Sequence, residues 1–313
     1  MKTIYIFILL VILSIVSLFT GVHDIGLMDI ISGNAEAINI MMLTRVPRLV
    51  SIITAGMAMS IGGVIMQQIS NNKFVSPTTA ATMDSAKLGA LVSMILFSSA
   101  GLSEKMIISF AFSLAGTFIF MKILKKVKVK NAIFIPLVGI MVGNVIGSIT
   151  DFFAYKYNLV QNMSSFLQGD FSMISKGNYE LLFVTVPLLI IAFMYANKFT
   201  IIGMGEDISK NLGLNFTRIS NIGVTIVALM SALVVITVGS IPFVGLIVPN
   251  IVSIFRGDNL SKNIGITSVF GAVFLLACDI IGRIIISPYE VPISLTVGVI
   301  GSVVFLYLIF RGK

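Results

Sequence analysis

The residues of this chain that are able to do chemistry are a few charges set in apolar surroundings. Three aspartates, Asp84, Asp151 and Asp279, lie in or beside apolar stretches, where a carboxylate is costly and persists mainly where it has a role. Asp279 and Arg283 are four residues apart, so they share one helical face and suit an internal ion pair. A carboxylate that carries a coupling ion in a secondary transporter is the alternative, and both interpretations stay open here.

Two arginines flank a proline just before a long apolar run. Arg45 and Arg48 stand on either side of Pro47. Long basic side chains in such a position anchor a helix at the membrane interface. The same charges would also steer an acidic partner into register, so anchoring and docking are the two functions considered.

Several motifs that carry catalysis are absent from the sequence. No G-x-x-x-x-G-K-[ST] loop occurs, and the single Gly-Lys pair is Gly312-Lys313, so ATP must be bound by a partner. Neither H-E-x-x-H nor G-x-S-x-G is found. One histidine, His23, and one cysteine, Cys278, exclude a multi-histidine or cysteine-rich metal site and an intrachain disulfide. The sequence therefore predicts neither an enzyme nor a resident metal or cofactor.

The composition is that of an integral membrane protein. Of the 313 residues, 57% are hydrophobic and 11% are charged, against roughly 25% charged in a soluble domain. At about 20 apolar residues per span, the chain holds material for about eight to ten membrane helices once Gly, Ser and Thr are added. The apolar runs fall roughly at 3–20, 49–69, 86–100, 106–124, 132–153, 181–197, 220–239, 243–255, 264–286 and 292–310. We expect an all-α membrane protein in which residues 1–313 form one domain.

The basic residues predict how the chain is oriented. With the N-terminus in the cytoplasm, fourteen of the 21 lysines and arginines lie inside, six lie outside, and Lys87 is unassigned. Both termini are therefore expected in the cytoplasm. The net charge of +8 is explained by these loops, so nucleic acid is not expected as a partner.

Small residues recur every four positions in two of the runs. They are Ala58 and Gly62 in one run, and Gly139, Gly143 and Gly147 in the other. Small residues let membrane helices approach closely, so both sets are expected at helix contacts, with the lining of a pathway as the alternative.

A cytoplasmic loop between two runs has the signals of a short helix. Residues 203–214 carry Asp207 as a candidate N-cap and Gly213 as a candidate terminator. Such a helix is either a surface feature or a lever held by a cytoplasmic subunit.

These residues, together with motifs spread through nearly the whole chain, resemble the FecCD-type permeases of ABC importers for ferric siderophores, haem and cobalamin. The matching segments are Arg45-Val46-Pro47-Arg48, Ala55-Gly56, Gly62-Gly63, Gln67-Gln68, Asn71 to Pro77, Gly89-Ala90, Gly239 to Ile251, Gly271-Ala272, Asp279, Arg283, Glu290 to Ile293, Gly298, Gly301 and Phe305.

The resemblance implies a type II ABC importer permease fold of ten spans in the plasma membrane. It implies a second, identical or similar permease chain, two ATP-binding subunits that hold ATP and Mg, and an extracytoplasmic substrate-binding protein. By resemblance, three arginines receive that binding protein: Arg45, Arg48 and Arg283. The coupling helix to the ATPase carries Gly203, Gly205, Glu206, Asp207, Leu212 and Gly213. Further structural or pathway candidates are Gln67, Asn72, Pro77, Gly245, Pro249, Asn250 and Asp279.

Two departures from the family pattern bear on the cargo. Asn250 stands where the family usually has a histidine, and the segment from Asn72 to Pro77 keeps only the ends of a common motif. With residues 78–84 after it, this variant is most similar to permeases for iron bound to catecholate siderophores. Haem or cobalamin as cargo, and ion-coupled secondary transport, are the alternatives.

Overall fold

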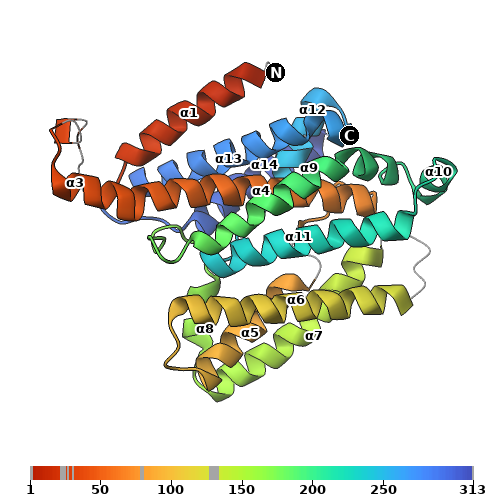
Figure 1. Ribbon diagram of the computed structural model, residues 1–313, viewed down its shortest axis with the longest axis horizontal. Coiled ribbons are helices and arrows are strands. Elements are labelled where there is room, and N and C mark those ends of the chain that lie inside the picture. The colour runs from red at the N-terminus through yellow and green to blue at the C-terminus, as the bar shows by residue number, and fades with distance from the viewer. Residues whose placement is uncertain are drawn as a thin grey trace.

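The structure is a computed structural model that describes residues 3–21, 26, 28–29, 32–77, 81–126 and 134–311. These residues form helices joined by turns, and in this part of the chain the only strand-like pairings are two isolated bridges, Gln168 with Ser240 and Ile286 with Tyr289. Figure 1 shows the helices running roughly alongside one another in one bundle. The all-α fold expected from composition is confirmed.

The longer helices coincide with the ten predicted apolar runs. They are α1 (Thr3–Phe19), α4 (Val46–Ser70), α5 (Thr82–Leu96), α6 (Leu102–Lys126), α7 (Phe134–Lys156), α9 (Thr185–Ile202), α11 (Phe216–Val238), α12 (Val244–Arg256), α13 (Leu260–Ile284) and α14 (Ile293–Arg311). Short elements between them are α3 (Ala35–Ile40), a π-helical turn (Met41–Arg45), α8 (Val160–Leu167), a 3₁₀ turn (Glu180–Val184) and α10 (Glu206–Asn211).

Six helical segments in the described part of the chain are long and apolar enough to cross a membrane. They are Ala35–Ser70, Leu102–Ile123, Leu137–Lys156, Glu180–Ile202, Phe216–Val238 and Leu260–Ile284. Ile4–Phe19, Val244–Arg256 and Ile293–Tyr307 are apolar but shorter.

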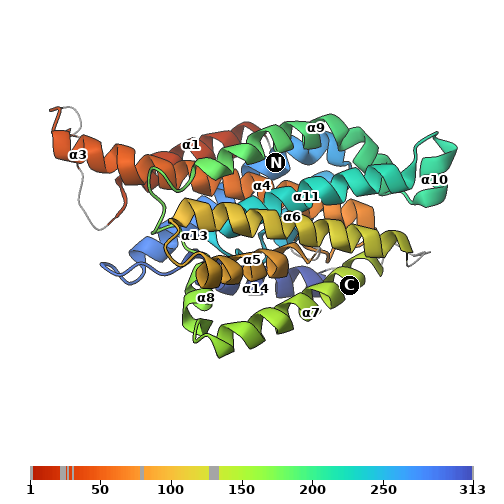
Figure 2. The same ribbon diagram turned by 60° about the horizontal axis from the view of Figure 1, so that its bottom comes forward.

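The bundle has two distinct ends. In Figures 1 and 2, α3 projects at one end and α10 at the opposite end. We call the first the arginine end, because Arg45 and Arg48 follow α3, and the second the loop-helix end. The core of the bundle is α4, which contacts α9, α11, α12 and α13, whereas α7 packs mainly on α5 and lies at the lower edge of Figure 2.

Glycines let α4 approach its neighbours at backbone contact. A methyl group on Gly63 would overlap the carbonyl oxygen of Gly245 in α12, and one on Gly56 would overlap that of Gly271 in α13. Membrane helices pack by such close approach, because burial from lipid supplies little hydrophobic drive. The predicted small residues of α4 also lie inside, with Ala58 buried and Gly62 in contact with Pro77.

The glycine row of α7 lies at a helix contact, as predicted, where α7 packs on α5. Gly143 and Gly147 face the carboxylate of Asp84 on α5, and a methyl group on Gly143 would overlap it. The small residues therefore make room for a polar side chain between two helices as well as for close packing.

An irregular segment connects α4 to α5 inside the bundle. Asn71 ends α4 in the left-handed conformation, with φ of 44°. The chain then turns back along α4, and Pro77 contacts Gly62 and Gly245. Non-helical backbone is tolerated at this depth where protein surrounds it. Since this segment occupies part of the bundle's length, α5 has only 15 residues.

Gly63 provides a test of this packing. We expect Gly63→Ala to destabilise the protein by about 1–3 kcal/mol, because the new methyl group has no room against Gly245. Gly265→Ala is the matched control, since its methyl group would lie 3.9 Å from the nearest atom, on Phe193. The measurement is thermal unfolding in detergent, followed with a thiol-reactive dye that reports exposure of the buried Cys278. Equal melting temperatures for both variants would contradict the close approach.

Candidate docking and coupling sites

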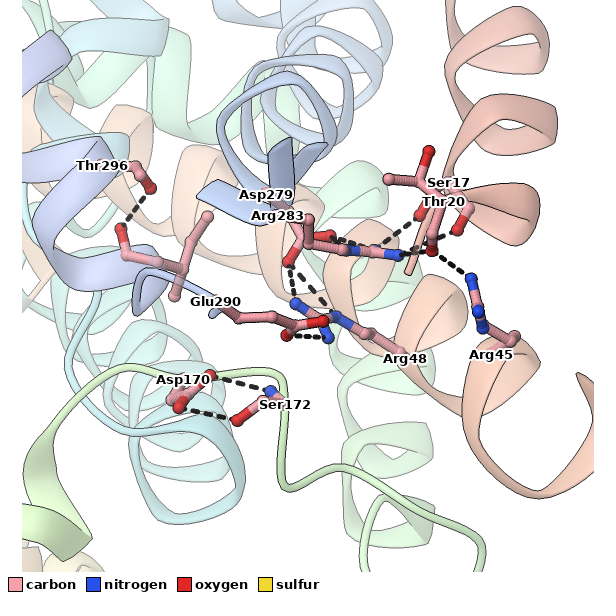
Figure 3. A network of polar contacts seen from close by, with 11 residues as sticks. Ser17, Thr20, Arg45, Arg48, Asp170, Ser172, Asp279, Arg283, Glu290 and Thr296 are labelled. Carbon is pink, nitrogen blue, oxygen red and sulfur yellow. Dashed lines mark hydrogen bonds and ion pairs between the residues drawn. The ribbon is translucent and has the colours of Figure 1, made fainter. Parts of the chain in front are cut away.

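At the arginine end, α4 and α13 are joined by a network of charges (Figure 3). Arg48 Nη2 lies 2.8 Å from Asp279 Oδ1, and Arg48 Nη1 lies 2.6 Å from Glu290 Oε2. Arg283 Nε donates to Asp279 Oδ2 at 2.8 Å. The ion pair between Asp279 and Arg283, predicted from their spacing, is confirmed. Asp279 is thus shared by two arginines from different helices.

Arg283 and Arg45 cap the C-terminal end of α1. Arg283 Nη1 donates to the carbonyl oxygens of Ser17 and Thr20, both at 2.9 Å, and Arg45 Nη1 also donates to the Thr20 carbonyl. The last carbonyl groups of a helix have no partner within it and carry partial negative charge. Guanidinium groups supply both the missing donors and the complementary charge.

All three predicted docking arginines surround one cavity of about 200 Å³. Its lining includes Arg45, Arg48, Arg283, Glu290 and Ser172. Counting Asp279, which pairs with Arg48 and Arg283, three cations face two carboxylates, so the cavity keeps an excess of positive charge. Arg45 and Arg283 are 8% and 6% exposed, which means that these side chains are held inside the protein rather than extended from its surface. Their proposed contact with a binding protein stays a prediction.

At the loop-helix end, α10 is a six-residue helix bounded by glycines. Gly205 is its N-cap with φ of 109°, and Gly213 follows its last turn with φ of 77°. The predicted terminator is confirmed, whereas Asp207 as N-cap is wrong: no side chain caps this helix. Glu206 and Asp207 instead occupy the first turn, where acidic residues favour the positive end of the helix dipole.

Polar contacts fix α10 to the bundle and leave an apolar surface facing outward. Ser209 Oγ donates to the carbonyl oxygens of Ile201 at 3.1 Å and of Gly205 at 2.7 Å. Met204, Ile208 and Leu212, spaced by four residues, are 55%, 46% and 59% exposed. Exposed apolar residues grouped in this way mark a surface for a partner.

One charged pair lies on the outward side of α10. Lys210 Nζ is 2.7 Å from Glu206 Oε1. The hydrogen bond to this carboxylate, followed by its charge, raises the pKa of Lys210. Because both side chains are largely exposed, the pair contributes little to stability.

Behind α10 lies a cavity of about 220 Å³ at the ends of α4, α12 and α13. Six of its lining residues carry side-chain amides: Gln67, Gln68, Asn71, Asn72, Asn250 and Asn263. Gly203 also lines it, so close to Gln68 that a methyl group on Gly203 would overlap that side chain. The loop that carries α10 is therefore in direct contact with the end of α4.

Asn250 ties the irregular segment to α12. Its Nδ2 donates to the carbonyl oxygens of Lys73 at 2.9 Å and of Leu246 at 2.7 Å. Beside it, Lys73 Nζ lies 2.9 Å from Asp258. Burial pushes the pKa of Asp258 upward, but hydrogen bonds from Ser253 and Lys73 outweigh this effect and leave the pKa lowered. The Asn250 amide thus serves as the donor that joins this segment to α12.

The structure divides the predicted pathway candidates between the two ends. Those that gather around the amide cavity and the irregular segment are Gln67, Asn72, Pro77, Gly245, Pro249 and Asn250. Asp279 lies at the arginine end instead.

Sequence reasoning assigned no role to Glu290 and did not pair Lys87 with Asp151. Glu290 is 242 positions from Arg48, and Lys87 Nζ lies 2.5 Å from Asp151 Oδ1 across α5 and α7. The available signal was a charge in an apolar setting, which indicates that a partner exists but not which one.

Among the described residues, no cluster of His, Cys, Asp and Glu is able to hold a metal ion.

Asp279 provides a test of the arginine network. We expect Asp279→Asn to destabilise the protein by about 3–5 kcal/mol, because it leaves the buried Arg283 without a carboxylate. Glu290→Gln is the comparison, since Glu290 is more exposed and Arg48 keeps Asp279 in that variant. Thermal unfolding in detergent measures both, and equal losses would refute the central position of Asp279.

The comparisons with known proteins agree over almost the entire chain. The sequence matches the FecCD transport family over residues 9–311. It is 56% identical over 313 residues to the petrobactin import system permease protein YclN of Bacillus subtilis, covering 100% of this chain and 99% of that protein. It is 38% identical over 296 residues to the ferric-anguibactin transport system permease protein FatD of Vibrio anguillarum, covering 95% and 94%.

A solved structure has the same fold. A putative metal-chelate type ABC transporter in an inward-facing conformation superposes with a TM-score of 0.88 at 21% identity, covering 99% of this chain and 98% of that one. Sequence and fold lead to one conclusion: the chain belongs to the FecCD transport family of ABC transporter permeases.

Proposed function

We propose that this chain is the membrane permease subunit of an ATP-driven importer that carries ferric siderophores, with a catecholate complex as cargo. The observation that carries the proposal is 56% identity, over the full length of both chains, to a permease named for petrobactin import. A second relative, from Bacillus anthracis, is also named for petrobactin and is 39% identical over 306 residues.

The arrangement of the helices supports ten spans in the plasma membrane. The six long apolar helices would be joined by α1, α5, α12 and α14. The two shortest, α5 and α12, have 15 and 13 residues and are flanked by irregular backbone packed against protein. The distribution of basic residues favours an orientation with both termini and α10 in the cytoplasm.

ATP would be bound and hydrolysed by two separate subunits, together with Mg²⁺. The sequence has no phosphate-binding loop, whereas α10 presents an apolar surface that fits a groove on such a subunit. A second permease, identical or similar, would complete the pathway between the two chains. An extracytoplasmic binding protein would deliver the chelate at the arginine end.

The contacts suggest how the two ends communicate. Ser209 attaches α10 to α9, and Gly203 abuts Gln68 at one end of α4. With 25 residues, α4 is about 37 Å long and carries Arg48 at its other end. A force applied to α10 would therefore tilt a helix whose far end is tied to Asp279 and Glu290. Such tilting is a route to alternating access.

Docking of the binding protein is proposed at the electropositive cavity formed by Arg45, Arg48 and Arg283. Carboxylates of a partner would compete there with Glu290.

Exchange of Arg45 for Glu is expected to weaken binding of the binding protein and to leave the ATPase complex intact. Unchanged affinity in a pull-down assay would remove Arg45 from the docking surface.

Two other functions make different predictions. Haem or cobalamin as cargo leaves the fold and coupling unchanged and alters only the transported molecule. An ion-coupled secondary transporter predicts uptake that follows an ion gradient without an ATPase. Asp279, one candidate for the coupling acid, is engaged with two arginines, which argues against that alternative.

Uptake of labelled iron tests the proposal. Cells that lack the gene are compared with cells in which it is restored, using iron presented as a catecholate chelate, with and without depletion of ATP. We expect restored uptake that is lost when ATP is depleted. Haem and cobalamin are supplied to the same cells, and transport of either one in place of the iron chelate would overturn the cargo assignment.

A charge in the apolar surface of α10 tests coupling. We expect Ile208→Asp to lower co-purification of the ATP-binding subunit by about tenfold, because burial of a carboxylate opposes docking. Lys210→Ala is the control, since it removes an exposed side chain from the same helix. Equal recovery of the ATPase with both variants would move coupling to another surface.

A further inference from the structure

The ion pair between Lys87 and Asp151 lies in an unusual position for two charges. Lys87 is in the second turn of α5 and Asp151 is on α7, with 2.5 Å between Nζ and Oδ1. The Lys87 side chain is 22% exposed, whereas that of Asp151 is 66% exposed. This contrasts with Asp279, whose carboxylate is buried among its partners.

The position of Asp151 along α7 disfavours a lipid-facing side chain. It is six residues beyond Val145, the middle of α7, and so about 9 Å along the helix axis from that middle. The hydrocarbon layer extends about 15 Å from the centre of a bilayer. With α7 centred in the bilayer, this carboxylate would lie within the hydrocarbon layer, so its exposed side is expected to face water or another protein chain.

The exposed surface of α7 carries a short row of polar residues among exposed apolar ones such as Val145. Asn144, Ser148, Asp151 and Tyr155 are all exposed and recur at helical spacing on one face. A polar row of this kind on a spanning helix is typical of the wall of an aqueous passage.

A cavity of about 700 Å³ opens at this pair, between α5, α7 and α8. Lys87 and Asp151 are its charged lining residues, with Tyr155, Ser164 and Gln168 beside them. The cavity is open to the outside, and its volume is comparable to that of small-molecule sites, roughly 300–1,000 Å³. On the other side of α8, a second cavity of about 660 Å³ shares Gln168 and is lined by Gln161, Asn162 and Asn178. Figure 2 shows α8 against α5 and α7 at the arginine-end side of the bundle.

We propose that Lys87 is a substrate-binding residue of the translocation pathway, where it exchanges Asp151 for the anionic oxygens of a passing iron chelate. The inference rests on the proposed function. Oxygens that bind iron(III) in catecholate and carboxylate chelates are deprotonated, so they present negatively charged groups to a cation in the pathway. A partly exposed ion pair is weak, and the flexible lysine stem lets the ammonium group move from one carboxylate to another acceptor. Asp151 then recovers Lys87 after the chelate has passed.

Transport by the complete importer, reconstituted in vesicles with its binding protein and ATP-binding subunits, tests the assignment. Vesicles with Lys87→Met are expected to take up labelled ferric catecholate about tenfold more slowly than wild type. ATP hydrolysis stimulated by the binding protein is expected to remain. Lys87→Arg keeps the charge and is expected to retain most uptake. Lys156→Met, which removes an exposed lysine in the last turn of α7 outside the cavity, is the matched control.

Asp151→Asn separates substrate binding from a structural tie between α5 and α7. If Lys87 receives the chelate, this variant frees the ammonium group and uptake is equal to wild type or faster. If the pair only joins the helices, uptake falls as far as with Lys87→Met, and the proposal is overturned. Uptake by Lys87→Met equal to wild type also overturns it. Lys87→Gln replaces Lys87→Met if thermal unfolding shows that the methionine variant is not folded.

The wild-type measurement distinguishes this inference from the proposed function. Absence of iron-chelate uptake by wild type refutes the proposed function and the inference with it. Normal uptake by wild type, together with no effect at Lys87, refutes the inference alone.

Discussion

A carboxylate removed from water must be given its partners by the protein, and Asp279 is where this constraint acts most strongly. Two guanidinium groups, from Arg48 on α4 and Arg283 on α13, share its oxygens, and Arg283 also supplies donors to the end of α1. Because an unpaired charge at this site would cost several kcal/mol, three helices are fixed relative to one another at the arginine end. The network is therefore a structural clamp first, and its electropositive cavity is a consequence of how the clamp is built.

The opposite end is fixed by neutral groups. The Gln67 amide donates to the carbonyl of Gly245 in α12, and the Asn250 amide donates to the carbonyl of Lys73 in the irregular segment beyond Asn71. Neutral amides satisfy backbone without the desolvation cost of a charge. An end built in this way is easier to rearrange than one built from buried ion pairs, which suits the side on which α10 is expected to receive a force.

Between the two ends, α4 joins a rigid clamp to an adaptable surface. Its glycines place it at backbone contact with α12 and α13, so it moves with those helices rather than independently. The α5 and α7 pair is attached less extensively, and its ion pair lies in an open cavity. The bundle thus combines a tightly packed core and a peripheral pair of helices beside an open cavity.

The sequence by itself determined the helices, because apolar length and the position of charges are local properties that the bilayer selects directly. It also determined the Asp279 and Arg283 pair, since a spacing of four residues on a helix leaves no choice of geometry. Only the tertiary structure decided that Arg48 and Glu290, 242 positions apart, share this network, and that Lys87 meets Asp151. It also decided that the glycines of α7 leave space for the carboxylate of Asp84, and that no side chain caps α10. Such contacts depend on which helices pack against one another. The apolar runs of this sequence are similar in character, so no run by itself specifies its neighbours.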